Sequence, residues 1–143
     1  MKKFLLALLL AALLTSMGIS MAADSKYTFL NLTKFAEENP IDPKLDFLIK
    51  QAALGKNASV ELAQVAPGTH FGAHYHNASD EIDYVIQGQV NMTIEGEVLS
   101  IKSGDLIYLP AFTVHSYDVL GDENFIAFVV FAPPFNETDR TFV

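Results

Sequence analysis

Hydrophobic and polar residues alternate over much of the chain after position 57, and this two-residue period predicts β-strands. About eight short runs rich in Val, Ile, Leu, Phe and Tyr are separated by Gly, Pro and Asn-containing turns. The clearest runs cover residues 58–66, 82–87, 90–95, 98–101, 106–109, 115–120 and 125–131. Short strands at this spacing, without an internal repeat, predict one all-β sandwich or barrel.

The residues before position 58 have a different pattern. A short strand is expected at 27–30, and Thr33 can cap a short helix at 34–38. A second helix is expected over Pro43–Leu54, because Pro suits a first helical turn and Gly55 provides a stop. The apolar residues that fit this second helix are Leu45, Leu48, Ile49, Ala52 and Ala53.

The first residues are typical of a secretory signal peptide. Two lysines precede the apolar run Phe4–Leu14, and small residues lead to cleavage after Ala22 or, alternatively, Ala23. The run is shorter than the ~20 residues that span a bilayer, so a retained anchor is the less favoured alternative. We expect a periplasmic or secreted protein without a stable membrane anchor after cleavage. The predicted division is a signal peptide at 1–22, an N-terminal extension with short helices at 23–57 and a barrel at 58–143.

Composition narrows the function classes. The chain has 143 residues, half of them hydrophobic, which suits one packed domain. Its net charge of −8 argues against nucleic-acid binding, which needs clustered Lys and Arg. There is no cysteine, so an exported form must be stabilised by packing, or by packing and a metal, without disulfides.

The four histidines are the main candidates for chemistry. His74 and His76 are two residues apart, which on a strand places both imidazoles on one face. Residues 68–88 read G-x5-H-x-H-x4-E-x6-G, and residues 104–115 read G-x5-P-x4-H. These two motifs resemble those of the cupin family.

The resemblance implies a cupin-type β-barrel, a double-stranded jelly roll, here with a short N-terminal helical segment. It implies metal ligation by His74, His76, Glu81 and His115. Three imidazoles and one carboxylate suit one divalent transition metal, and Mn, Fe, Zn and Cu all remain open. The resemblance also implies a homodimer that pairs through barrel edges, although the helix expected at 43–54 could cover an edge instead.

Two further residues are candidates for catalytic roles. If Glu81 points inward, strand alternation sends Asp83 inward too, where it could act as a general base or bind a substrate hydroxyl. The alternatives are that a bulge turns Asp83 outward, or that it pairs with Lys102. Tyr117 should share the inner face with His115 and could donate a proton, with plain core packing as the alternative.

Three other polar residues have weaker signals. His70 is expected to be a loop histidine, with a supporting position behind the metal ligands as the alternative. Gln64 faces inward or outward according to the register of its strand. Arg140, the only arginine, is expected to form a surface ion pair with Asp139 or a nearby Glu, although it could also lie over an anion or a dimer contact.

The sequence therefore supports two functions. The first is a small-molecule metalloenzyme of dioxygenase, isomerase or lyase type, in which Asp83 or Tyr117 moves protons. The second is a non-catalytic periplasmic protein that binds a metal or a small ligand.

Overall fold

The computed structural model describes residues 27–143, so the predicted signal peptide lies outside the described residues. In this part of the chain no helix is both long and apolar enough to cross a membrane. The elements are α1 (Leu32–Glu38), β1 (Phe47–Leu54), β2 (Ser59–Val65), β3 (His70–His76), β4 (Asp80–Gln87), β5 (Gln89–Ile94), β6 (Glu97–Lys102), β7 (Leu106–Leu109), β8 (His115–Leu120), β9 (Phe125–Ala132), the 3-10 helix η1 (Glu137–Asp139) and β10 (Arg140–Phe142).

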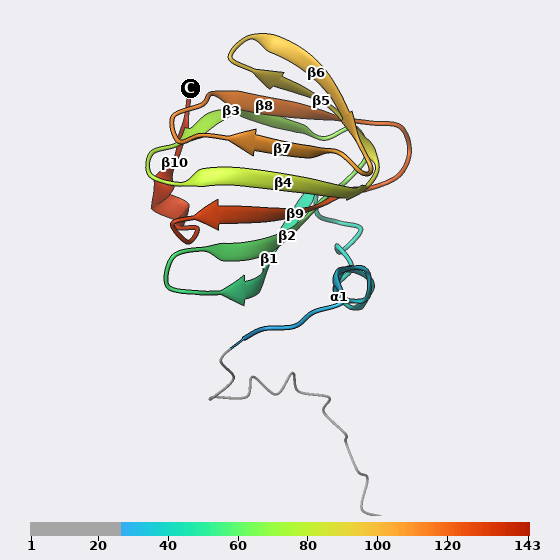
Figure 1. Ribbon diagram of the computed structural model, residues 1–143. Helices are drawn as coiled ribbons and strands as arrows, with labels where there is room; N and C mark the ends of the chain where they lie inside the picture. The colour runs from blue at the N-terminus through green and yellow to red at the C-terminus, as the bar shows by residue number, and fades with distance from the viewer. Residues whose placement is uncertain (1–26) are drawn as a thin grey trace, which may run out of the picture.

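The strands form two five-stranded antiparallel sheets that face each other (Figure 1). The first sheet has the order β1-β2-β9-β4-β7, and the second has the order β10-β3-β8-β5-β6. The predicted all-β barrel with a short N-terminal helical segment is therefore confirmed. Apart from the consecutive pairs β1-β2 and β5-β6, neighbours in each sheet are not consecutive in the sequence, and the pairing of β3 with β8 brings the two histidine motifs together.

The main core lies between the two sheets. Alternate residues of each strand point inward, as the two-residue period predicts. Val85 and Val90 are completely buried, and the inward side chains of β9 begin and end with an aromatic ring, Phe125 and Phe131. The buried residues of this core are Ala63, Val65, Val85, Val90, Met92, Ile101, Leu109, Val119, Phe125, Ala127, Val129 and Phe131.

A second apolar cluster covers the outer face of the first sheet. Leu62 of β2 and Phe128 of β9 pack there against Phe35 and Ala36 of α1. The helix begins at Leu32, two residues before the predicted start. Its N-cap is Asn31 rather than Thr33, because the Asn31 side chain accepts a hydrogen bond from the Lys34 backbone N at 3.0 Å.

Two predicted N-terminal elements are wrong. Residues 27–30 form no strand, and the residues predicted as a second helix form strand β1 instead. The segment pairs along its length with β2, with Phe47 opposite Val65 and Leu54 opposite Ser59. Pairing with the free edge of β2 outweighs the weak helical spacing, because tertiary context overrides local propensity. The predicted boundary at residue 58 falls in the loop of this hairpin.

Candidate metal centre

A β-bulge in β3 determines which histidines reach the interior. The register between β3 and β8 shifts between Phe71 and His74, so both of these side chains lie on the inner side. His70 therefore points outward despite its even spacing from His74. Its Nδ1 lies 2.7 Å from Oδ1 of Asp118 in an exposed pair, so His70 does not belong to the site.

Four side chains from three strands converge inside the barrel. His74 and His76 come from β3, Glu81 begins the inward face of β4, and His115 begins β8 directly opposite His74. One ligand atom from each residue lies within 4.8 Å of all the others. Oε2 of Glu81 lies 3.1 Å from Nε2 of His76 and 3.3 Å from Nε2 of His115. The four residues that the sequence predicted as metal ligands are thus brought together, and all are buried.

The outer ring nitrogens of the histidines fix their orientation. Nδ1 of His74 lies 2.9 Å from the carbonyl O of Gly72, and Nδ1 of His115 lies 3.0 Å from that of Thr113. A carbonyl accepts a hydrogen bond, so each Nδ1 carries the proton and donates it. The Nε2 lone pairs of both rings are then free to ligate a metal.

His76 is oriented differently, by a carboxylate that the sequence analysis did not assign to the site. Oδ2 of Asp139 lies 3.4 Å from Nδ1 of His76. Asp139 also accepts hydrogen bonds from the backbone N of Ala78 at 2.7 Å and of Ser79 at 3.2 Å. Burial raises the pKa of Asp139, but these hydrogen bonds outweigh burial and hold the pKa below its ordinary value. A carboxylate behind a ligating imidazole is a common partner in metal sites.

The charges of the cluster suit cation binding. Burial raises the pKa of Glu81, but the close approach of the His115 and His76 imidazoles reverses this effect and holds the pKa well below its ordinary value. Burial, followed by the charge of His115, lowers the pKa of His74 to about 4. For His115, burial lowers the pKa, but the interaction with Glu81 raises it by more. Near neutral pH the carboxylate is therefore ionised and His74 is neutral, which are the forms that bind a metal.

The donor set fits a divalent transition metal. Oε2 of Glu81 is buried and Nδ1 of His76 is buried, and neither has a well-formed hydrogen bond within residues 27–143. A buried, ionised carboxylate oxygen without a full set of partners is costly, and a cation among the imidazoles would compensate it. Neutral imidazoles with one carboxylate suit the first-row divalent metals.

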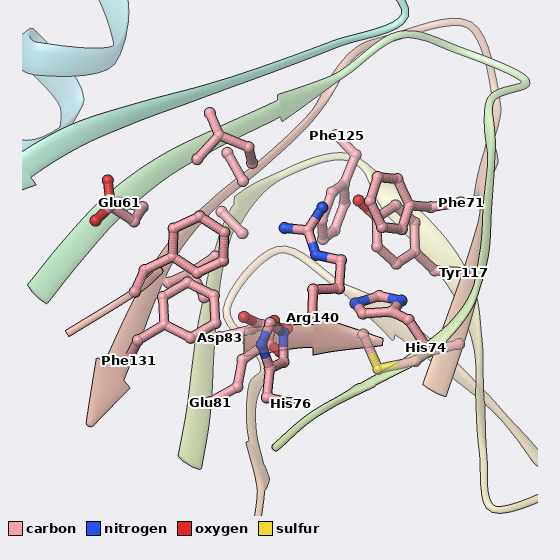
Figure 2. A pocket seen from close by; sticks show the side chains of 16 residues that line it. Glu61, Phe71, His74, His76, Glu81, Asp83, Tyr117, Phe125, Phe131 and Arg140 are labelled. Carbon is pink, nitrogen blue, oxygen red and sulfur yellow. The ribbon is translucent and has the colours of Figure 1, made fainter. Parts of the chain in front are cut away.

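Asp83 and Tyr117 lie beside this cluster and line the same cavity (Figure 2). Asp83 is buried and faces inward, as strand alternation predicts, and it does not pair with Lys102. Burial, followed by the charge of Glu81, raises the pKa of Asp83 well above its ordinary value. Burial also raises the pKa of Tyr117, whose ring stacks on Phe71 at 5.1 Å between centroids.

The structure also places three other polar residues, and it corrects the prediction for one of them, Arg140. Gln64 points to the outer face, where its amide donates to the carbonyl O of Asn39 at 2.6 Å. Glu61, on the opposite face of the same strand, lines the cavity instead, and strand alternation alone could not say which face was inward. Arg140 does not pair with Asp139, because Asp139 turns toward His76 and Arg140 points into the barrel.

Two neighbouring cavities share four lining side chains, and the inner one reaches the cluster. The inner cavity, of about 40 Å³, is lined by His74, His76 and Glu81 among mostly apolar side chains. That volume holds roughly two or three waters. The outer cavity, of about 620 Å³, opens between β1 and β10. The side chains that line both cavities are Ile49, Glu61, Phe135 and Arg140.

Comparisons with known proteins identify relatives of this barrel. The family profile described as "Cupin domain" matches residues 61–131. The uncharacterized protein MJ1618 of Methanocaldococcus jannaschii is 32% identical over 85 residues, which are 59% of this chain and 68% of that protein. Quercetin 2,3-dioxygenase of Bacillus subtilis is 41% identical over 44 residues, which are 31% of this chain and 13% of that enzyme.

A solved structure shows the same fold at low identity. The nucleoside dehydratase Pac13 of Streptomyces has a TM-score of 0.63 and 24% identity, over 83% of this chain and 92% of that one. The profile match runs from β2 into β9. It therefore includes Glu61 and all four clustered side chains. Together with the relative matched over more than two thirds of its length, it shows that this chain belongs to the cupin family.

Proposed function

We propose that this cupin is an exported metalloenzyme that acts on a small, oxygen-bearing organic molecule, in a reaction of dioxygenase, isomerase or lyase type. The observation that carries the proposal is the placement of two further ionisable groups, Asp83 and Tyr117, in the same cavity as the clustered ligands. The similarity to a quercetin 2,3-dioxygenase and the fold shared with a nucleoside dehydratase support a catalytic cupin.

The metal of the proposal is Mn²⁺, Fe²⁺, Zn²⁺ or Cu²⁺, held by His74, His76, Glu81 and His115. When bound, it supplies Lewis acidity, or oxygen activation where the metal is redox-active. If the metal is six-coordinate, these four ligands would leave positions open for a substrate oxygen. A closed structural site would not need the cavity that leads to this cluster.

The chain's own residues position the substrate and move protons. Asp83 has a raised pKa and a buried Oδ1 without a hydrogen-bond partner in residues 27–143, so it can donate a proton to a substrate oxygen and later accept one. Tyr117 keeps its proton because burial raises its pKa, and its hydroxyl serves as a hydrogen-bond donor. The aromatic rings of Phe71, Phe125 and Phe131 line the cavity and limit water near these groups.

Export and dimerisation complete the proposal. The lysine-preceded apolar run at the N-terminus supports export to the periplasm or the medium.

Tyr84, Leu106 and Tyr108 expose apolar surface on neighbouring strands β4 and β7, which supports a homodimer through this face. Light scattering on the purified protein checks the mass, and a monomer at all concentrations would contradict the dimer.

The test combines turnover with a control carboxylate. The protein loaded with each metal is screened against small hydroxylated and keto compounds, with oxygen uptake and NMR of the products as readouts. Turnover is expected, and Asp83→Asn should lose it while retaining one equivalent of metal. The matched variant Asp118→Asn, on the exposed side of β8, should keep full activity. Metal binding without turnover of any compound would favour the non-catalytic binding protein instead.

A further inference from the structure

Arg140 is held over the metal-ligand cluster by the register of the last strand. Strand β10 pairs with β3, and Arg140 lies directly opposite His76. Residues opposite each other in an antiparallel pair project to the same face of the sheet. The side chain therefore extends into the barrel, where Figure 2 shows its guanidinium in the middle of the pocket, between Glu61 on one side and Phe71 on the other.

The guanidinium has apolar neighbours and no anionic partner. Its central carbon lies 5.2 Å from the centroid of Phe71 and 5.3 Å from that of Phe135. Nε is buried without a hydrogen-bond partner, and no carboxylate of residues 27–143 lies within ion-pair distance of Arg140. A cation stacked between rings, with its donors unused, is prepared to bind an anion, because guanidinium donors match both oxygens of a carboxylate.

The position of Arg140 between the cavities determines what can reach it. The inner cavity has room for only a few waters, so an organic ligand must occupy the outer cavity and extend past Arg140 toward the cluster. The outer cavity is lined by the apolar side chains of Phe47, Ile49 and Phe142. A ligand that fits has an apolar body and one acidic group.

The other charges that face this space do not compensate Arg140. Glu61 and Asp83 line the same cavity, but no ion pair joins either carboxylate to Arg140 in residues 27–143. Glu81 is already engaged by His76 and His115. Glu137 lies on the exposed rim of the outer cavity. No carboxylate of the described residues is paired with Arg140, so an acidic ligand can supply the opposite charge.

We propose that Arg140 binds a carboxylate of the substrate, so that the substrates of this cupin are small organic acids with an apolar or aromatic body. The inference rests on the proposed function and defines the substrate class of the same site. The carboxylate lies on the guanidinium between the rings of Phe71 and Phe135, and the apolar body of the acid occupies the outer cavity.

Binding of simple acids tests the proposal without turnover. Benzoate and pyruvate are titrated by calorimetry into metal-free and zinc-loaded protein, with neutral benzamide as the uncharged counterpart of benzoate. At least one acid should bind both forms, and benzamide should bind much more weakly. In Arg140→Met the affinity for the acid should fall by about 10- to 100-fold. Arg140→Lys should retain part of the affinity, because it keeps the charge but not the paired donors.

Control measurements separate this outcome from loss of fold or of metal. Zinc content and the thermal midpoint should change little in Arg140→Met, and Lys102→Met, which removes an exposed positive charge elsewhere, should bind the acid like the wild type. Equal binding by wild type and Arg140→Met would overturn the proposal, as would binding that disappears when zinc is removed. Failure of every acid to bind the wild type would also overturn it. Acid binding that depends on Arg140, without turnover of any compound, would contradict the proposed enzyme and leave this inference intact.

Discussion

Replacement of Asp139 by Asn tests how the C-terminal segment orients a metal ligand. The carboxylate accepts two backbone hydrogen bonds from the loop after β3 and lies against Nδ1 of His76. An Asn side chain has one acceptor oxygen, so one of these backbone donors or the imidazole N–H meets an amide NH₂. Hydrogen bonds to a charged group are worth about 1.5–3 kcal/mol, and the variant should lose about that much unfolding free energy.

The same change should weaken metal binding. A partner behind a ligating imidazole typically contributes about 10- to 100-fold in metal affinity. Calorimetric titration of metal-free Asp139→Asn with Zn²⁺ and Mn²⁺ should therefore give dissociation constants raised by about that factor. Glu137→Gln is the matched control, because Glu137 belongs to the same 3-10 helix but is exposed and does not contact His76. An unchanged dissociation constant in a folded Asp139→Asn would refute the proposed orientation of His76.

The pH dependence of the unfolding free energy gives an independent check that Asp139 stabilises the fold in its ionised form. The pKa of Asp139 is held below its ordinary value in the folded protein, so its ionised form stabilises the fold above about pH 4. This contribution is lost as the pH falls through the lowered pKa. The stability difference between wild type and Asp139→Asn should be complete near neutral pH and should shrink in acid. A stability difference that grows on acidification would contradict a stabilising role for the ionised Asp139 carboxylate.

Three further substitutions, one of them a control, test the fold around the site. In Gly88→Ala the new Cβ would lie 2.8 Å from the Asn124 carbonyl O, at a backbone φ of +79°, so the variant should lose more than about 2 kcal/mol by chemical denaturation. Gly96→Ala has a similar φ of +86° but open space, and should lose only about 1 kcal/mol; equal losses would contradict the close packing at Gly88. Leu62→Ala removes a fully buried side chain beneath α1 and should cost about 2–5 kcal/mol, whereas a loss below 1 kcal/mol would show that α1 does not pack there.

The inner faces of the central strands could be predicted from the sequence because burial on one side imposes a strict alternation. Glu81 and Asp83, two residues apart on β4, both point inward as this rule requires. His74 and His76 share a face for the same reason, and His115 reaches them through the register between β8 and β3. The resemblance to cupin motifs, and not alternation alone, implied the full ligand set, because the register that brings His115 to the other three is visible only in the structure.

Alternation failed where the chain departs from a regular strand or where both faces are covered. The bulge in β3 reverses the face of His70, and nothing in the local sequence beyond its glycines signals that shift. Strand β2 is buried on both sides, between the core and α1, so the burial of Gln64 did not reveal its direction. The role of Arg140 depended on the pairing of β10 with β3, in which Arg140 lies opposite His76, 64 positions earlier in the chain. Strand β1 was missed because its pairing with β2 outweighs a helical spacing of apolar residues.

Metal content tests the central claim most directly. The protein purified without chelators from its native compartment is analysed by elemental mass spectrometry beside His76→Ala and the control His70→Ala, whose imidazole lies outside the cluster. We predict about one equivalent of a divalent first-row metal in the wild type and in His70→Ala, and its loss in His76→Ala. A wild-type protein that contains no metal and gains none on incubation with Mn²⁺, Fe²⁺, Zn²⁺ or Cu²⁺ would contradict the metal centre.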